Sequence, residues 1–208
     1  MSETTSASPY RSFKEKLCTF ARGQRGIRNP FVIAAVDPAV EHRTAKRLEA
    51  WATTPAEAPA IPDGVTVQPI WLDELLPKTD VYKLLVDLGE PLSEFEDEVS
   101  AGERIEETMQ DRLAAELVQQ ILEEAVAEEK VKTQSHVLLL LNLGSLYPFS
   151  RASELLDELD RRNVKSTIGI PFPGDVVGGK LSFFGGPSRH YYPAHQINSP
   201  IREVHLQR

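Results

Sequence analysis

The stretch HVLLLLN, from His136 to Asn142, is the clearest sign of how this chain folds. Five apolar residues follow one another in it, with no polar residue at alternate positions. A short apolar run of this kind is typical of a strand that is buried on both faces, as in a parallel sheet covered by helices. FVIAAV, which ends at Asp37-Pro38, has the same character and predicts a second buried strand.

Working outward from these two runs, strands alternate with helical patterns. Further strands are predicted at VTVQPI, STIGIPF and KLSFF, and helices at 10–20, 39–51, 71–76, 81–88, 102–130 and 151–161. Such alternation implies right-handed crossovers and parallel strands. We therefore expect an α/β fold with a mostly parallel sheet of about five strands and helices on both faces. This is a P-loop/Rossmann-like three-layer arrangement.

The 208 residues are expected to form a disordered N-terminal tail, 1–9, and a single α/β domain, 10–208. Within that domain, residues 53–64 are rich in proline and alanine and predict a loop. Residues 187–208 are predicted to be an irregular C-terminal segment.

Composition excludes several classes of protein. A formal net charge of -8 opposes a dedicated nucleic-acid grip, which needs a basic surface, so we expect no direct specific nucleic-acid binding. A single cysteine, Cys18, rules out an internal disulfide and a Cys-rich zinc site. With neither a signal-peptide pattern nor a long apolar run, we expect a cytoplasmic protein that does not contact membranes.

One motif suggests a nucleotide site. Gly174-x-x-x-x-Gly179-Lys180 satisfies the first seven positions of the phosphate-binding P-loop. A working P-loop continues with Ser or Thr and a helix, whereas here Leu181 follows and LSFFGGP has strand composition. We therefore interpret the motif as a glycine-rich turn between two strands, without a functional P-loop.

Other catalytic patterns are weaker still. The five histidines lack metal-ligand spacing, and no nucleophile is paired with a base, so we expect no catalytic residues, metal or cofactor. One alternative remains open at the carboxyl edge of the sheet, where open α/β sheets bind ligands. There Asp37, Gly144 and Arg151 could hold a nucleotide or other small ligand, although Asp37 is also placed to cap the helix that follows it.

Two aromatic and basic clusters are candidate partner-binding sites. Tyr147, Phe149 and Arg151 directly follow the most buried strand, and Arg189, Tyr191 and Tyr192 form the second cluster. Each could pack into the core. If both gather at the carboxyl edge, they would form one contact surface of the kind that partner proteins recognise.

The order of these pieces resembles the BrxB family of BREX bacteriophage-defence systems. The buried strand is followed by a glycine, by Tyr147-Pro-Phe-x-Arg151, and by Leu155-Leu-x-x-Leu159. Phe172-Pro-Gly174, Gly178, Leu181-x-x-Phe184-Gly185 and Tyr191-Tyr192 then come in the expected order. Ser182 stands where the family has an arginine, and Pro193-Ala-His195 replaces its Arg-Ala-Phe, so the chain resembles a divergent branch.

The resemblance implies a non-enzymatic component of the defence system. It implies contact with a PglZ-like protein, the alkaline-phosphatase-like member, and with other BREX components in an assembly that modifies host DNA and blocks phage. The alternative is the nucleotide- or small-ligand-binding α/β protein described above.

Overall fold

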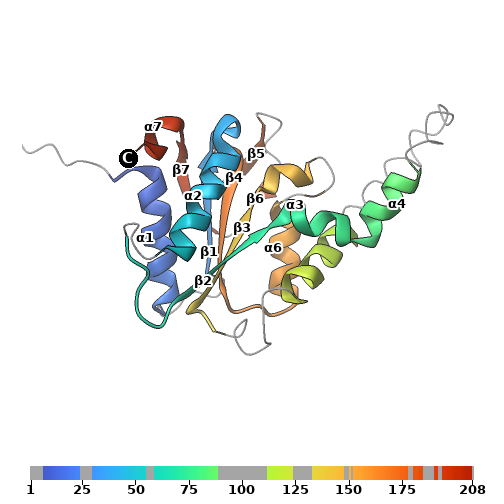
Figure 1. Ribbon diagram of the computed structural model, residues 1–208, viewed down its shortest axis with the longest axis horizontal. Coiled ribbons are helices and arrows are strands. Elements are labelled where there is room, and N and C mark those ends of the chain that lie inside the picture. The colour runs from blue at the N-terminus through green and yellow to red at the C-terminus, as the bar shows by residue number, and fades with distance from the viewer. Residues whose placement is uncertain are drawn as a thin grey trace, which may run out of the picture.

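The fold is described from a computed structural model of the chain (Figure 1). The structure describes residues 7–23, 30–54, 59–88, 112–123, 133–147, 150, 152–177, 180–184, 190–191 and 194–207. Parts of the predicted tail 1–9, of the loop 53–64 and of the helix 102–130 lie outside these residues. Within the described part of the chain, no helix is long and apolar enough to span a bilayer.

Five parallel strands form the body of the sheet, in the order β2-β3-β4-β1-β7. Their bounds are Phe31–Val36 for β1, Thr66–Trp71 for β2, His136–Leu141 for β3, Thr167–Val177 for β4 and His195–Ile201 for β7. The expected parallel sheet of about five strands is thus confirmed. The two apolar runs became β1 and β3, and every residue of both strands is buried.

Helices cover both faces of the sheet, as expected (Figure 1). Successive side chains of a strand point to opposite faces, so Phe31 and Ile33 join one apolar cluster while Val32 and Ala34 join the other. Helices α3 (Leu72–Leu75), α4 (Asp80–Leu88) and α6 (Ala152–Arg161), with the helical residues 112–123, pack on the first face. Helices α1 (Pro9–Ala21), α2 (Glu41–Thr53) and α7 (Glu203–Leu206) pack on the second. This is the predicted three-layer arrangement.

The helices predicted at 10–20, 39–51, 71–76, 81–88 and 151–161 begin and end close to those positions, whereas η5 (Leu143–Leu146) and α7 were not predicted. Their bounds are Pro9–Ala21 for α1, Pro38–Val40 for the 3-10 turn η1, Glu41–Thr53 for α2, Leu72–Leu75 for α3, Leu76–Lys78 for η2, Asp80–Leu88 for α4, Leu143–Leu146 for η5, Ala152–Arg161 for α6 and Glu203–Leu206 for α7. Trp71, expected to be helical, closes β2 instead. Ser8 caps α1 by accepting a hydrogen bond from the Arg11 N–H.

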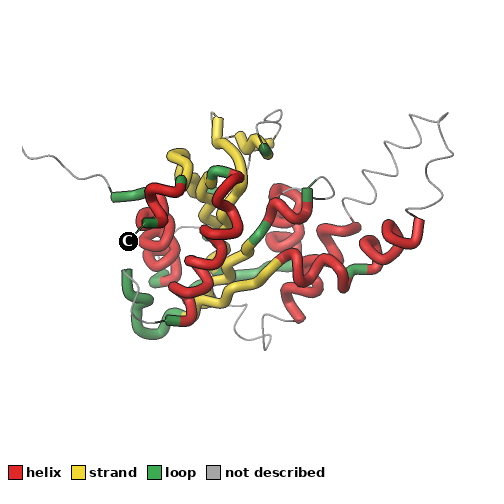
Figure 2. The backbone as a smooth tube through the Cα atoms, turned by 45° about the horizontal axis from the view of Figure 1, so that its top comes forward, coloured by secondary structure: helices red, strands yellow, loops and turns green. Residues whose placement is uncertain are grey.

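An antiparallel extension continues the sheet beyond its parallel body (Figure 2). Strand β4 runs past the end of β1 and pairs with β5, Lys180–Phe183, which in turn pairs with β6, His190–Tyr191. KLSFF is therefore a strand, as predicted, but it lies outside the parallel body. This extension stands at the edge where the parallel strands end.

The prediction that residues 187–208 are irregular was wrong. Strand β7 occupies His195–Ile201 beside β1, and α7 follows it. An edge strand is covered less completely than a central one, so HQINSPI lacks the apolar run that marks β1 and β3. The buried side chains of Ile201 and Leu206 anchor the segment. Arg43 of α2 forms an ion pair with Glu203, and Arg47 of α2 donates a hydrogen bond to the Leu206 carbonyl oxygen.

Candidate functional site at the carboxyl edge

Parallel strands end at a common edge, and the segments that follow β1, β2 and β3 meet there. Strand β1 leads into η1 and α2, β2 leads into α3, and β3 leads into η5. Asn142, between β3 and η5, takes the left-handed conformation that asparagine tolerates better than most residues. This edge therefore gathers polar groups from three separate parts of the chain.

Asp37 acts here as a helix cap. Its Oδ1 accepts a hydrogen bond from the Ala39 N–H at 3.0 Å, at the start of η1. Its backbone N–H donates to the carbonyl of Ile201 at 2.9 Å, which ties the end of β1 to β7. Both groups therefore hold local structure, as the capping interpretation predicted.

The space beside Gly144 is occupied by the side chain of Glu41. The Glu41 carboxylate accepts a hydrogen bond from the Gly144 N–H, with 2.7 Å between nitrogen and Oε1. A Cβ at position 144 would lie only 2.2 Å from the second oxygen, Oε2, and 3.1 Å from Cζ of Phe184. Thus Glu41 fills the space beside Gly144 that a small ligand would need.

Glu41 is an acidic residue in a buried position, since only 8% of it is exposed. Burial raises the pKa of its carboxyl above the ordinary value, and the nearby Asp73 carboxylate raises it further, while the Gly144 N–H lowers it. Oδ1 of Asp73 is itself buried and has no hydrogen-bond partner among the described residues. Two acidic groups therefore share a poorly solvated corner of this edge.

An exposed aromatic cluster lies next to this corner. We call it the aromatic edge cluster, and it consists of Tyr147, Phe183 and Phe184. The ring of Tyr147 is 5.7 Å from that of Phe183 and 5.3 Å from that of Phe184, measured between centroids. Tyr147 is 55% exposed and Phe184 is 44% exposed, although both are large apolar side chains.

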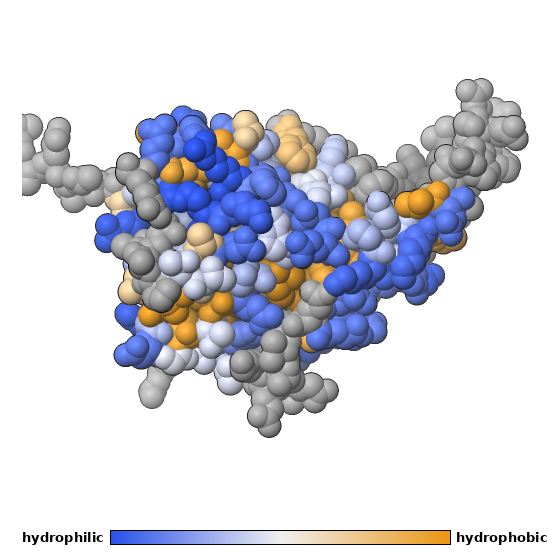
Figure 3. Space-filling model, in the orientation of Figure 1, coloured by the Kyte–Doolittle hydropathy of each residue, from blue (hydrophilic) through white to orange (hydrophobic). Residues whose placement is uncertain are grey.

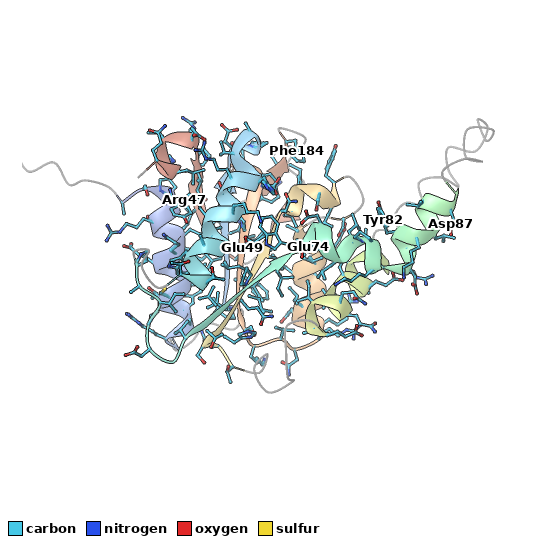
Figure 4. The ribbon with its side chains drawn as sticks, viewed as in Figure 1. Arg47, Glu49, Glu74, Tyr82, Asp87 and Phe184 are labelled. Atoms are coloured by element: carbon cyan, nitrogen blue, oxygen red, sulfur yellow. The ribbon has the colours of Figure 1, made fainter. Side chains whose placement is uncertain are left out.

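The base of the cluster is anchored in the core. Phe183 packs edge-on against buried Phe172 of β4, with centroids 4.7 Å apart. Phe184 has a φ of +46°, a conformation that is strained for a bulky residue and is often found at functional sites. Figure 4 places Phe184 at the upper edge of the molecule, where hydrophobic side chains interrupt a mostly hydrophilic face (Figure 3).

Comparison with known proteins identifies the family. A model of the family described as "BREX protein BrxB" matches residues 78–197, more than half of the chain. The chain belongs to the BrxB family. It is therefore a component of a BREX phage-defence system. No curated protein and no solved structure matches it.

The BrxB match bears directly on the site. All three residues of the aromatic edge cluster fall inside the matched residues, whereas Asp37, Glu41 and Asp73 precede them. The cluster therefore lies in the part of the chain that the family model matches. The acidic corner is supplied by the segment before it.

Only some of the site residues predicted from the sequence are described. Tyr147 directly follows η5 and is exposed, and its role in docking stays a prediction. Tyr191 belongs to β6 and pairs with Lys180 through the backbone, so the extension brings it toward the same edge. Phe149, Arg151, Arg189 and Tyr192 lie outside the described residues, and their roles stay predictions.

Phe183, Phe184 and Glu41 were missed as site residues. A sequence signal existed for the two phenylalanines, because neighbouring residues of a strand point to opposite faces and so one of the pair is directed away from the core. Glu41 gave no such signal, since an acidic residue in the first turn of a helix is ordinary.

The P-loop-like motif connects two strands, as interpreted from the sequence. Gly174 lies within β4, and Lys180 begins β5, which pairs antiparallel with β4 through Val177. No helix begins within the described residues 180–184, where a P-loop would start one. Among the described residues, no three His, Cys, Asp or Glu side chains are grouped so that they could hold a metal ion.

Proposed function

We propose that this BrxB-family chain is a non-catalytic interaction component of its BREX system, and that it docks a PglZ-like protein through the aromatic edge cluster. The observation that carries the proposal is that exposed rings of this cluster contact a ring that packs on the core. Tyr147 and Phe184 present large apolar surfaces, and Phe183 fixes them to the core through Phe172. Rigid aromatic side chains are the residues that most often dominate binding energy at protein interfaces.

The charged groups at the edge support a structural role over catalysis. Asp37 caps a helix turn, and Glu41 binds the Gly144 N–H. The small-ligand alternative would need Asp37 and Gly144, with Arg151, to face a ligand. The bonds that Asp37 and the Gly144 N–H already make within the chain favour the docking role.

The test is co-expression of a tagged copy with the PglZ-like protein of the same BREX system, followed by size-exclusion chromatography. We expect the two proteins to elute together at a fixed ratio. Tyr147→Ala or Phe184→Ala should weaken the complex by about 30-fold or more, as alanine does at interface hot spots. Melting temperature should change little, because both rings are about half exposed.

Val204→Ala is the matched control. Val204 is a 65% exposed apolar residue on α7, outside the residues that match the family. It should leave the complex intact. Separate elution of the unmodified proteins at several salt concentrations, or full binding by both aromatic variants, would count against the proposal.

A further inference from the structure

The aromatic edge cluster borders the Glu41 carboxylate, and only one oxygen of this carboxylate accepts a hydrogen bond from the described residues. Oε1 of Glu41 accepts the Gly144 hydrogen bond, while Oε2 has no hydrogen-bond partner among the described residues. Oε2 and Cζ of Phe184 both approach the same point, the position of a Cβ on Gly144. The carboxylate and the exposed ring are therefore direct neighbours.

Among the residues that the structure describes, none supplies a positive charge to this corner. No lysine, arginine or histidine of the described residues forms an ion pair with the Glu41 carboxylate, and the charged group that raises its pKa is another acid, Asp73. A buried carboxylate without a cationic partner is costly, and a second carboxylate nearby adds to the cost. A cation supplied from outside would relieve both.

We infer that the aromatic edge cluster receives an arginine side chain of a docked protein, with its guanidinium group directed at Glu41 Oε2 and stacked on Phe184. This inference rests on the proposed docking function and names the chemistry that the partner presents. A planar guanidinium fits both features, since it binds carboxylates through paired N–H groups and stacks on aromatic rings. It is also more weakly hydrated than the ammonium group of lysine, which suits a poorly solvated corner.

A metal ion is a poorer fit to the same corner. Divalent cations such as Mg²⁺ and Ca²⁺ take six or more oxygen ligands, and the corner offers two carboxylates with no third acidic or histidine ligand among the described residues. The exposed rings of Tyr147 and Phe184 would contribute nothing to such a site. They do contribute to an arginine site.

The experiment uses a probe that does not depend on the partner. Nα-acetyl-arginine amide is titrated into the full chain and followed by NMR, with the uncharged citrulline analogue as a chemical control. We expect saturable, millimolar binding of the arginine probe, with shifts at Gly144 and Tyr147, and no saturation with citrulline. Glu41→Gln keeps an acceptor for the Gly144 N–H but removes the charge, and it should weaken binding about tenfold or more.

Glu74→Gln is the matched control. Glu74 is an exposed acid beside Asp73 on α3 (Figure 4), so its loss changes the net charge equally without touching the corner. Binding by this variant should equal that of the unmodified chain. Equal binding of arginine and citrulline, equal losses in the two variants, or shifts at Gly144 with Mg²⁺ in place of the arginine probe would overturn the inference.

The same two variants separate this inference from the proposed function. In the co-elution assay, Glu41→Gln should weaken the complex while Glu74→Gln does not. If the unmodified chain binds the arginine probe but never the PglZ-like protein, the assigned partner is wrong and the arginine site stands. If it binds the PglZ-like protein with equal strength in both variants, docking stands and the arginine site is wrong.

Discussion

Replacing Gly144 with alanine is the sharpest test of the contact between Glu41 and η5. The added Cβ would lie 2.2 Å from Oε2 and 3.1 Å from Cδ of Glu41, so the carboxylate must move. Glu41 is flexible enough to move, but it then abandons the Gly144 N–H bond of 2.7 Å. We expect folding to tolerate the change at a measurable cost.

The magnitude follows from the bond that is lost. Leaving a buried N–H without a partner costs about 1–3 kcal/mol, and the Gly144 N–H is only partly buried, so we expect Gly144→Ala to lower the free energy of unfolding by about 1 kcal/mol. For a chain of this size, that corresponds to a fall in melting temperature of about 2–4 °C. Urea denaturation followed by circular dichroism would measure it.

A double-mutant cycle shows whether Glu41 is the cause. In a Glu41→Ala background the alanine at 144 meets no carboxylate, although Cζ of Phe184 is still 3.1 Å away. Gly144→Ala should therefore cost about 1 kcal/mol less there than in the unmodified chain, a coupling expected only for residues in contact. The same cost in both backgrounds would refute the reasoning, since the clash would then lie elsewhere.

Three further predictions concern the same edge. Burial raises the pKa of the Glu41 carboxyl above 4.5, so between 4.5 and the raised pKa the folded chain keeps the carboxyl proton that the unfolded chain has lost. As pH rises through this interval, the unmodified chain should therefore lose stability relative to Glu41→Gln. Urea denaturation at a series of pH values would measure the difference. Asp37→Ala should cost about 1 kcal/mol in a thermal melt by removing the cap on Ala39, and Asp37→Asn should restore most of it. Phe184→Asn should relieve the strain of a φ of +46° and hold the melting temperature while weakening partner co-elution, and a fall of many degrees would show the ring to be structural.

The parallel body of the sheet was predictable because burial on both faces leaves a mark in the sequence. Strands β1 and β3 are continuous apolar runs, and no register or partner had to be known to find them. Strand β7 was not predicted because an edge strand is only partly buried, and its polar residues and Pro200 were typical of a loop. Hydrophobic patterns in a sequence indicate which residues are buried. They indicate strand pairing only for strands that are buried as well as paired.

The site was less predictable because it depends on strand order. Glu41 follows β1 and Gly144 follows β3, and 103 positions separate them in the chain. They meet although β4 lies between their two strands in the sheet. Tyr147 could be selected from composition next to a buried strand, but no periodicity brings Glu41 to the same place. Contacts across the sheet edge require the order of the strands.

The glycine that resembles a phosphate loop in sequence has a different physical purpose in the fold. A Cβ on Gly174 would lie 2.1 Å from the Ser182 carbonyl oxygen and 3.0 Å from the ring of Phe172, so only glycine lets β5 approach β4 this closely. That approach sets Phe183 against Phe172 and carries Phe184 to the corner beside Gly144. Gly174 therefore allows the aromatic edge cluster to form, and the cluster lies at the edge of the sheet where a phosphate loop would hold a nucleotide. A sheet edge suited to ligands is in this way filled from within by Glu41 and covered by rings that face outward.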